Sequence, residues 1–68
     1  MKFDIYGKFQ LKIEREEERW RVYKIGNGLH MPVHDLIIPS DLTPEDLPAF
    51  LDDFFHEAAT PGTMVREI

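Results

Sequence analysis

Two histidines in this chain have the spacing with which a helix binds zinc. His30 and His34 form an H-x3-H pair, but Pro32 lies between them and the surrounding apolar pattern is that of an extended chain. Four residues of extended chain span about 13 Å, which is too far for two imidazoles to share one ion. We therefore expect no metal site, and interpret both histidines as solvent-facing residues near an edge strand.

A second group of chemically capable residues lies on a predicted helix. Asp52 and His56 are four residues apart, as are Asp53 and Glu57, and the first pair is expected to form a local ion pair when His56 is charged. A catalytic His–Asp pair needs a nucleophile or a substrate carbonyl, and the single serine, Ser40, stands in a proline-flanked loop. Side chains of adjacent helical residues diverge by about 100°, which disfavours a shared Mg²⁺ at Asp52 and Asp53. The group is interpreted as a solvated acidic face, with no cofactor and no catalytic role.

Aromatic and basic side chains alternate on one predicted sheet face. Tyr23 and Ile25 are expected to point outward, together with Tyr6, Lys8, Gln10, Lys12, Arg19 and Arg21. Such a face can stack and neutralise single-stranded nucleic acid, but Tyr and Arg are equally typical of protein interfaces. Asp4 and Glu14 dilute the positive charge, and there is no RNP-like sequence. The face is therefore a candidate interface whose partner the pattern leaves open.

Charge is distributed unevenly along the 68 residues, whose net charge is −5. Residues 1–34 carry seven Lys/Arg against five Asp/Glu, whereas residues 35–68 carry one Arg against eight Asp/Glu. An acidic total disfavours nucleic-acid binding, which depends on clustered Lys and Arg. The chain has no cysteine, which fits a reducing compartment, and no apolar run of membrane-spanning length. We expect a single domain over residues 1–68 in the cytoplasm, without membrane contact.

The elements that position these residues begin with a regular alternation. From Met1 to Ile13 the odd positions are apolar except Gly7, and the even positions are polar or tyrosine. A period of two predicts one half-buried strand over residues 1–13.

A charged break separates this strand from the next apolar run, which resumes at Trp20. A four-residue turn over 15–18 would place the apolar residues of both strands on one face. The expected partners are Glu14 with Arg19, Ile13 with Trp20, and Leu11 with Val22, and Lys12 then opposes Arg21. A two-residue turn at Glu16 and Glu17 gives the same register but requires positive φ from glutamates, so the longer loop is favoured.

The rest of the chain predicts a short third strand, a helix and a last strand. Residues 26–28 form a reversal, and Pro32 makes any strand within 29–38 an edge or interrupted strand. Thr43 is a typical N-cap before Pro44. The helix should be 3₁₀-like at first and regular from near Pro48, with an apolar face of Leu47, Phe50, Leu51, Phe54, Phe55 and Ala58. Residues 63–68 are interpreted as a final edge strand.

Together these elements predict an α+β fold. An antiparallel sheet, made of a long β-hairpin and one or two short strands, packs on one amphipathic helix in the order β-β-β-α-β. The core is expected to contain Trp20 facing Ile13, with Phe50, Leu51 and Phe54 supplied by the helix.

Four stretches are similar to a family of short bacterial proteins of unknown function. They are K-F-D-I-Y-G-K-F at the start, I-I-P-S-D-L before the helix, L-D-D-F-F-H-E within it and P-G after it. The resemblance covers nearly the whole chain and implies the fold, but no catalytic residues. The element order also resembles the N-terminal module of HicB-type antitoxins, whose P-G-C stretch this sequence lacks.

The sequence thus favours a non-enzymatic accessory or protein-binding module with a protein partner, and a homodimer is compatible with so small a core. The candidate interface residues are Tyr23, Arg21, Arg19 and Lys12 on the sheet, and Asp52, Asp53 and Glu57 on the helix. The alternative is a single-stranded nucleic-acid-binding module that uses the Tyr/Arg sheet face.

Overall fold

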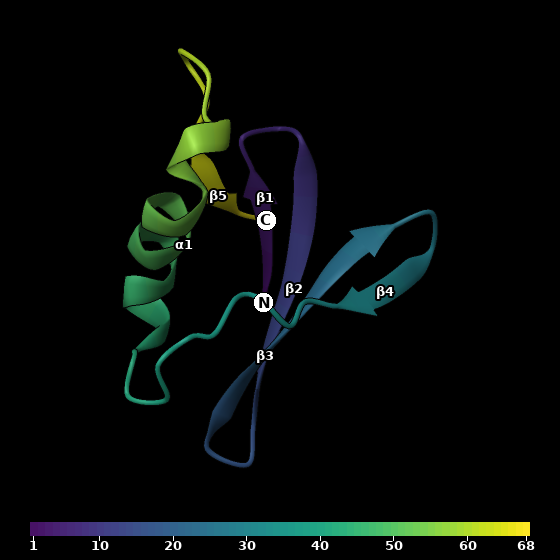
Figure 1. Ribbon diagram of the computed structural model, residues 1–68, viewed down its shortest axis with the longest axis vertical. Coiled ribbons are helices and arrows are strands. Elements are labelled where there is room, and N and C mark those ends of the chain that lie inside the picture. The colour runs from purple at the N-terminus through teal and green to yellow at the C-terminus, as the bar shows by residue number, and fades with distance from the viewer.

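The computed structural model describes residues 1–68. It contains a five-stranded antiparallel sheet with one helix packed against one of its faces (Figure 1). The elements are β1 (Lys2–Ile5), β2 (Phe9–Glu16), β3 (Arg19–Gly26), β4 (Leu29–Pro32), the 3₁₀ turn η1 (Pro44–Asp46), α1 (Leu47–Phe55), the 3₁₀ turn η2 (His56–Ala58) and β5 (Val65–Glu67). The strand order is β4-β3-β2-β1-β5. The predicted α+β class is confirmed, with one strand more than expected.

The additional strand arises because the first thirteen residues form a hairpin, so the expectation of one continuous strand was wrong. The chain reverses at Tyr6 (φ 56°) and Gly7 (φ 71°), and β1 pairs with β2. Ile5 lies opposite Phe9, so odd residues pair with odd residues across the turn. The apolar residues of both strands therefore stay at odd positions on one face of the sheet. For this reason the sequence pattern of the hairpin is the same as that of a single strand.

The β2–β3 turn also differs from the expectation. It contains two residues, Glu17–Glu18, with φ of 50° and 66°. Positive φ at both positions gives the turn a twist that matches the flanking strands, and here that outweighs its cost for glutamate. Arg21 consequently lies opposite Glu14, and Lys12 lies opposite Tyr23, so the expected Lys12–Arg21 repulsion does not occur. Because the register moved by two residues, the faces of both strands remain as predicted.

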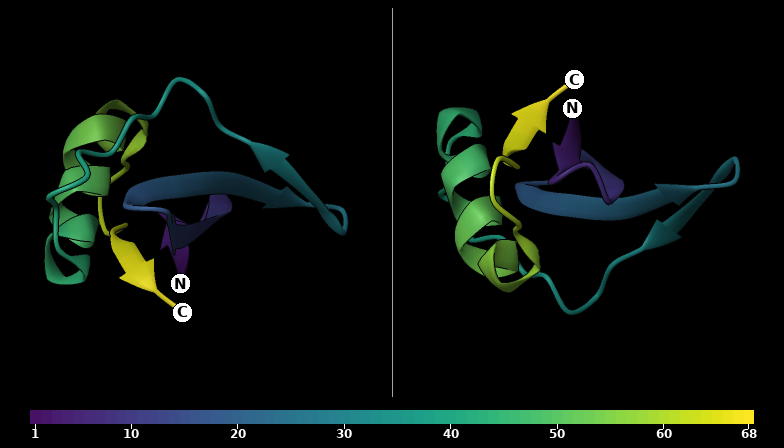
Figure 2. Two further views of the ribbon diagram at one scale, coloured as in Figure 1. Left: turned by 90° about the horizontal axis from the view of Figure 1, so that it is seen from below. Right: turned by 90° about the horizontal axis from the view of Figure 1, so that it is seen from above.

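Both edges of the sheet are short strands, as the sequence indicated. The turn before β4 has positive φ at Asn27 and Gly28. β4 ends at Pro32, and residues 33–38 form no strand. At the opposite edge β5 pairs with β1. Figure 2 shows that the β3–β4 hairpin extends away from α1.

The predicted start of the helix is confirmed. Thr43 occupies the N-cap position, Pro44 opens a 3₁₀ turn, and α1 begins at Leu47. The Thr43 hydroxyl, however, donates to the Asp46 carboxylate (2.8 Å) instead of accepting from a backbone N–H.

The core lies between the helix and the inner face of the sheet, which we define as the face toward α1. Its ten buried residues are Phe3, Ile5, Tyr6, Leu11, Ile13, Val22, Leu36, Ile38, Leu47 and Leu51. The expected core position of Phe54 is wrong, because its ring is 47% exposed and packs edge-on against Phe55. Leu47 and Leu51 form a stripe at i, i+4 that Phe55 continues, which leaves Phe54 on the flank. Trp20 is only half-buried and lies opposite Arg15, not Ile13.

Candidate functional site

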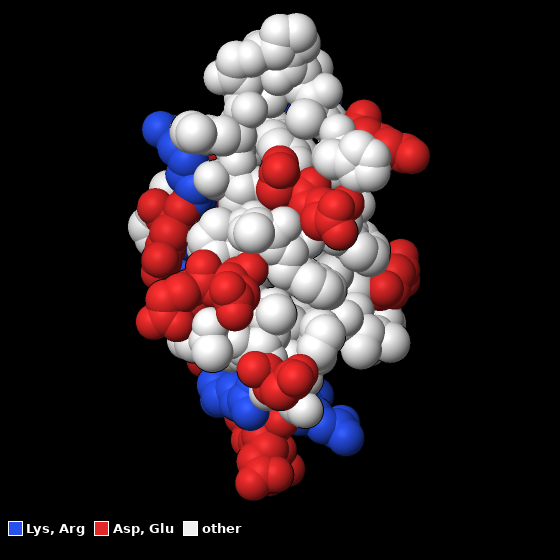
Figure 3. Space-filling view, turned by 90° about the vertical axis from the view of Figure 1, so that its left-hand side faces the viewer, with Lys and Arg blue, Asp and Glu red and all other residues white.

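The acidic helix residues have different partners and do not form one group. Asp52 accepts the Tyr6 hydroxyl on its carboxylate (2.5 Å) and on its backbone carbonyl (3.1 Å). The expected Asp52–His56 ion pair is absent: α1 ends at Phe55, and the His56 Nδ1 lies 2.9 Å from the Asp53 carbonyl oxygen. Figure 3, which faces the helix side, shows carboxylates in separate groups with uncharged surface between them. Asp52 therefore holds the helix to the β1–β2 turn, while Asp53 is exposed.

Tyr6 is buried, which corrects the expectation that it lies on the outer face. Its positive φ rotates it out of the alternation of the strand, and its side chain is 3% exposed. Burial raises the pKa of the phenol to about 12, and the hydrogen bond to Asp52 and the negative charge of that carboxylate act in the same direction. The outer face of the sheet therefore carries one tyrosine, Tyr23.

The outer face, opposite the helix, brings together the predicted sheet residues. Tyr23 is half-buried, Arg19 and Arg21 are exposed, and Lys12 lies beside Tyr23 on the neighbouring strand. Salt bridges join Lys12 to Glu14 (3.3 Å) and Arg21 to Glu16 (3.8 Å). At these exposures such pairs are worth less than about 1 kcal/mol, so both cations are available to a partner.

Sequence reasoning missed a hollow of about 610 Å³ beside the first half of β3. We name it the β3 hollow. It is lined by Arg19, Trp20, Arg21, Val22 and Tyr23 on one side and by Pro32, Val33, His34, Leu36, Ile37, Ile38, Pro39 and Ser40 on the other. No carboxylate lines it, although the chain carries a net charge of −5. The sequence feature that could have indicated this hollow is Pro32. It ends β4 opposite Tyr23, so β4 is shorter than β3 and leaves the first half of β3 uncovered.

The strand edge along this hollow has unpaired backbone groups. In β3 the hydrogen bonds to β2 and to β4 alternate along the strand, and the Val22 carbonyl accepts from the N–H of Val33 (2.9 Å). Trp20 has the same orientation two residues earlier, beyond the end of β4. Its N–H and C=O therefore face the hollow.

The opposite wall is a segment held at both of its ends. At one end Val33 bonds to Val22, and at the other the Arg15 guanidinium donates to the Ser40 carbonyl (2.6 Å). The Trp20 indole N–H donates to the carbonyl of Leu42 (3.2 Å), and Arg15 lies over the indole ring (5.0 Å). Between these ties, residues 34–38 neither donate nor accept a hydrogen bond.

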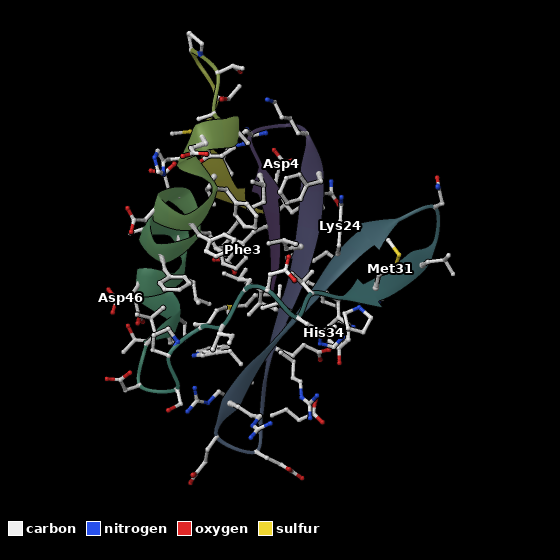
Figure 4. The ribbon with its side chains drawn as sticks, in the orientation of Figure 1. Phe3, Asp4, Lys24, Met31, His34 and Asp46 are labelled. Atoms are coloured by element: carbon white, nitrogen blue, oxygen red, sulfur yellow. The ribbon has the colours of Figure 1, made fainter.

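Side-chain orientation along this wall alternates between core and solvent. Leu36 and Ile38 are 4% and 6% exposed, whereas Ile37 is 80% exposed. Figure 4 shows His34 where the chain leaves β4 beside β3. The wall is thus anchored by Leu36 and Ile38 and presents the apolar side chain of Ile37 to solvent.

The histidines are separate from one another and from the carboxylates. His30 and His34 are both exposed, and no three His, Cys, Asp or Glu side chains converge to hold a metal ion. None of the helices has the length and apolar character needed to cross a membrane.

Comparison with known proteins gives one match. The family model described as a domain of unknown function, DUF7661, matches residues 1–68. No curated protein and no solved structure matches the chain. The resemblance to an uncharacterised family is confirmed by this match.

Proposed function

We propose that this chain, which belongs to the DUF7661 family, is a non-enzymatic protein-binding module. Its contact surface would comprise the β3 hollow and the adjoining side chains of the outer face. The chain has no cysteine, which fits action in a reducing compartment such as the cytoplasm.

The observation that carries the proposal is the composition of the β3 hollow. Arginine, tyrosine and tryptophan are the residue types that dominate binding energy at protein interfaces, and Arg21, Tyr23 and Trp20 line it together. Exposed Ile37 adds apolar area at its rim. In an acidic chain, this lining contains two arginines and no carboxylate.

The residues that would supply catalysis have structural partners, which supports a binding role. The Asp52 carboxylate is engaged by Tyr6, and His56 by the Asp53 carbonyl. Ser40 is exposed, and its carbonyl binds Arg15. No histidine is hydrogen-bonded to a hydroxyl group, which is the arrangement that activates a serine.

A single-stranded nucleic acid would use the same surface and is the competing partner. The charge of Arg19 and Arg21 along a groove favours it. Against it, Tyr6 is buried, so one tyrosine is left on this face for stacking, and the chain as a whole is acidic, which disfavours binding to phosphates. We therefore favour a protein partner.

The test is partner capture with surface variants. The tagged protein is incubated with lysate of the cells that express it, and bound proteins are identified by mass. Combining Tyr23→Ala with Arg21→Ala should abolish specific capture while the chain stays folded, as checked by circular dichroism, since neither residue belongs to the buried core.

The matched control removes charge from the helix face. Asp53→Asn with Glu57→Gln should leave capture intact. If capture instead fails only in this control, the helix face is the interface and the proposal is wrong. The nucleic-acid alternative would be supported instead if the protein bound a single-stranded oligonucleotide in a salt-sensitive way and the Tyr23→Ala, Arg21→Ala variant did not.

A further inference from the structure

We propose that the β3 hollow binds an extended, acidic peptide segment, which adds to the sheet as a strand beside Arg19–Val22. This inference rests on the proposed protein-binding function and names the chemistry and conformation of the partner.

The first support is the unpaired edge of β3. β4 pairs with β3 only from Tyr23 to Gly26, and the Val33 N–H adds one bond to the Val22 carbonyl, so Arg19–Arg21 have no hydrogen-bonded neighbour on that side. The Trp20 N–H and C=O face this gap, and these are the groups that hold a strand in an antiparallel or parallel ladder. Peptides commonly bind sheet edges in this way, and the main chain then supplies much of the affinity.

The second support is the shape of the opposite wall. Residues 34–38 leave the line of β4 and return to the sheet only where Ser40 and Leu42 are tied to Arg15 and Trp20. This path keeps the wall apart from the first half of β3 and leaves room for a strand beside it. The open stretch of β3 matches about four residues of added strand, at about 3.3 Å per residue.

The third support is charge. Arg19 and Arg21 alternate with Trp20 along β3, so both guanidinium groups lie on the outer-face side of the hollow. A strand with carboxylates at every second position would place them along these arginines. Its intervening residues would lie toward the apolar side, near Leu36 and Ile38. The structure thus favours a segment that alternates acidic and apolar residues.

A second copy of this chain fits less well. Acidic residues of the chain are concentrated in the β2–β3 turn and between Asp41 and Glu57, where the backbone is turned or helical. Neither edge strand supplies an alternating acidic sequence, since β4 is Leu-His-Met-Pro and β5 is Val-Arg-Glu.

The test uses capped synthetic heptapeptides and NMR of the ¹⁵N-labelled full chain. The probe alternates Glu and Val, one control alternates Lys and Val, and a second control is the acidic peptide with alternate backbone nitrogens methylated. The acidic probe should shift the amides of Trp20 and Val22 and slow their hydrogen exchange. Both controls should bind about tenfold more weakly, because one reverses the charge and the other removes ladder donors.

A charge-reversal variant provides a check that does not depend on removing core contacts. Arg19→Glu with Arg21→Glu should reverse the preference, so that the Lys peptide binds more tightly than the Glu peptide. Asp53→Lys with Glu57→Lys, on the exposed end of the helix, is the matched control and should keep the original preference.

Three results would overturn strand addition. One is binding of the acidic probe without slower exchange at Trp20 and Val22, which would indicate side-chain contact alone. A second is equal binding of the methylated peptide. The third is protection of these amides that grows with protein concentration in the absence of peptide, which would identify a second copy as the occupant. Lysate capture that still depends on Tyr23 would then show that the protein-binding function stands although this inference fails.

Discussion

Two neighbouring isoleucines allow a sharp test of how the wall of the β3 hollow is oriented. Ile37 and Ile38 have the same side chain and adjacent positions, but Ile37 is 80% exposed and Ile38 is 6% exposed. Removing the buried side chain to Ala loses its transfer free energy and leaves a cavity, at a cost of about 2 to 5 kcal/mol. Removing the exposed one should change the free energy of unfolding by less than about 0.5 kcal/mol.

These costs are large relative to the stability of so small a domain. A chain of this length is expected to have a free energy of unfolding of about 3 to 10 kcal/mol. Ile38→Ala would then remove between about one fifth and all of it. Each kcal/mol lowers the melting temperature of such a domain by about 4 to 8 °C, so the two variants should be well separated.

Unfolding in urea is monitored by the fluorescence of Trp20 and by circular dichroism. The two variants should have the same m-value, so that a difference in urea midpoint reports a difference in stability. Ile37→Ala should also weaken binding of the acidic peptide, since Ile37 lines the hollow. Equal destabilisation by the two substitutions, or a larger effect at Ile37, would refute the orientation of this segment and with it one wall of the proposed site.

Three further predictions concern the turns, a buried phenol and the histidines. Because the pKa of Tyr6 is raised from 10.0 to about 12, its contribution to stability is present below pH 10 and is lost as the pH rises toward 12; Tyr6→Phe should remove this part of the alkaline destabilisation, measured by urea midpoints across that range. Replacing the β2–β3 turn by Glu17→Asn with Glu18→Gly should raise the free energy of unfolding by about 1 kcal/mol, because Asn and Gly adopt positive φ at lower cost; an unchanged urea midpoint would argue against the two-residue turn. Micromolar Zn²⁺ should leave the melting temperature unchanged within about 1 °C, and a rise of many degrees would mean that His30 and His34 meet a third ligand.

The sequence was sufficient where local chemistry and periodicity act alone. Thr43 and Pro44 specify the start of the helical region, and Pro32 specifies an edge strand, because each effect depends on one residue and its neighbours. The facing of the strands was also predicted correctly, since an error of two residues in register leaves parity unchanged.

The β1–β2 and β2–β3 turns were not predictable from residue preference, unlike the turn at Asn27 and Gly28. Tyr6, Glu17 and Glu18 all adopt positive φ, which single-residue propensities disfavour. The twist of the strands rewards this conformation, and that reward appears only when both strands are in place. The error had a functional consequence, because the turn at Tyr6 moves a tyrosine from the expected outer face into the core.

The candidate site was predictable in its side chains but not in its shape. Arg19, Arg21 and Tyr23 follow from alternation on one strand. The β3 hollow depends instead on the path of residues 33–40, which have no periodic pattern and are positioned by contacts with Arg15 and Trp20. Such long-range ties carry no local signal.

The two free stretches of edge on this side of the sheet differ in what they can accept. In β4, Leu29 and Met31 face β3, so the backbone groups of His30 and Pro32 face outward. Proline has no N–H, which deprives that edge of one of its donors and disfavours pairing with another chain. On β3 the corresponding outward residue is Trp20, which keeps both its donor and its acceptor. The same proline that blunts β4 also ends it, and thereby leaves β3 open. A strand that joins this side of the sheet should therefore bind beside β3, in the hollow lined by arginines, and not along β4.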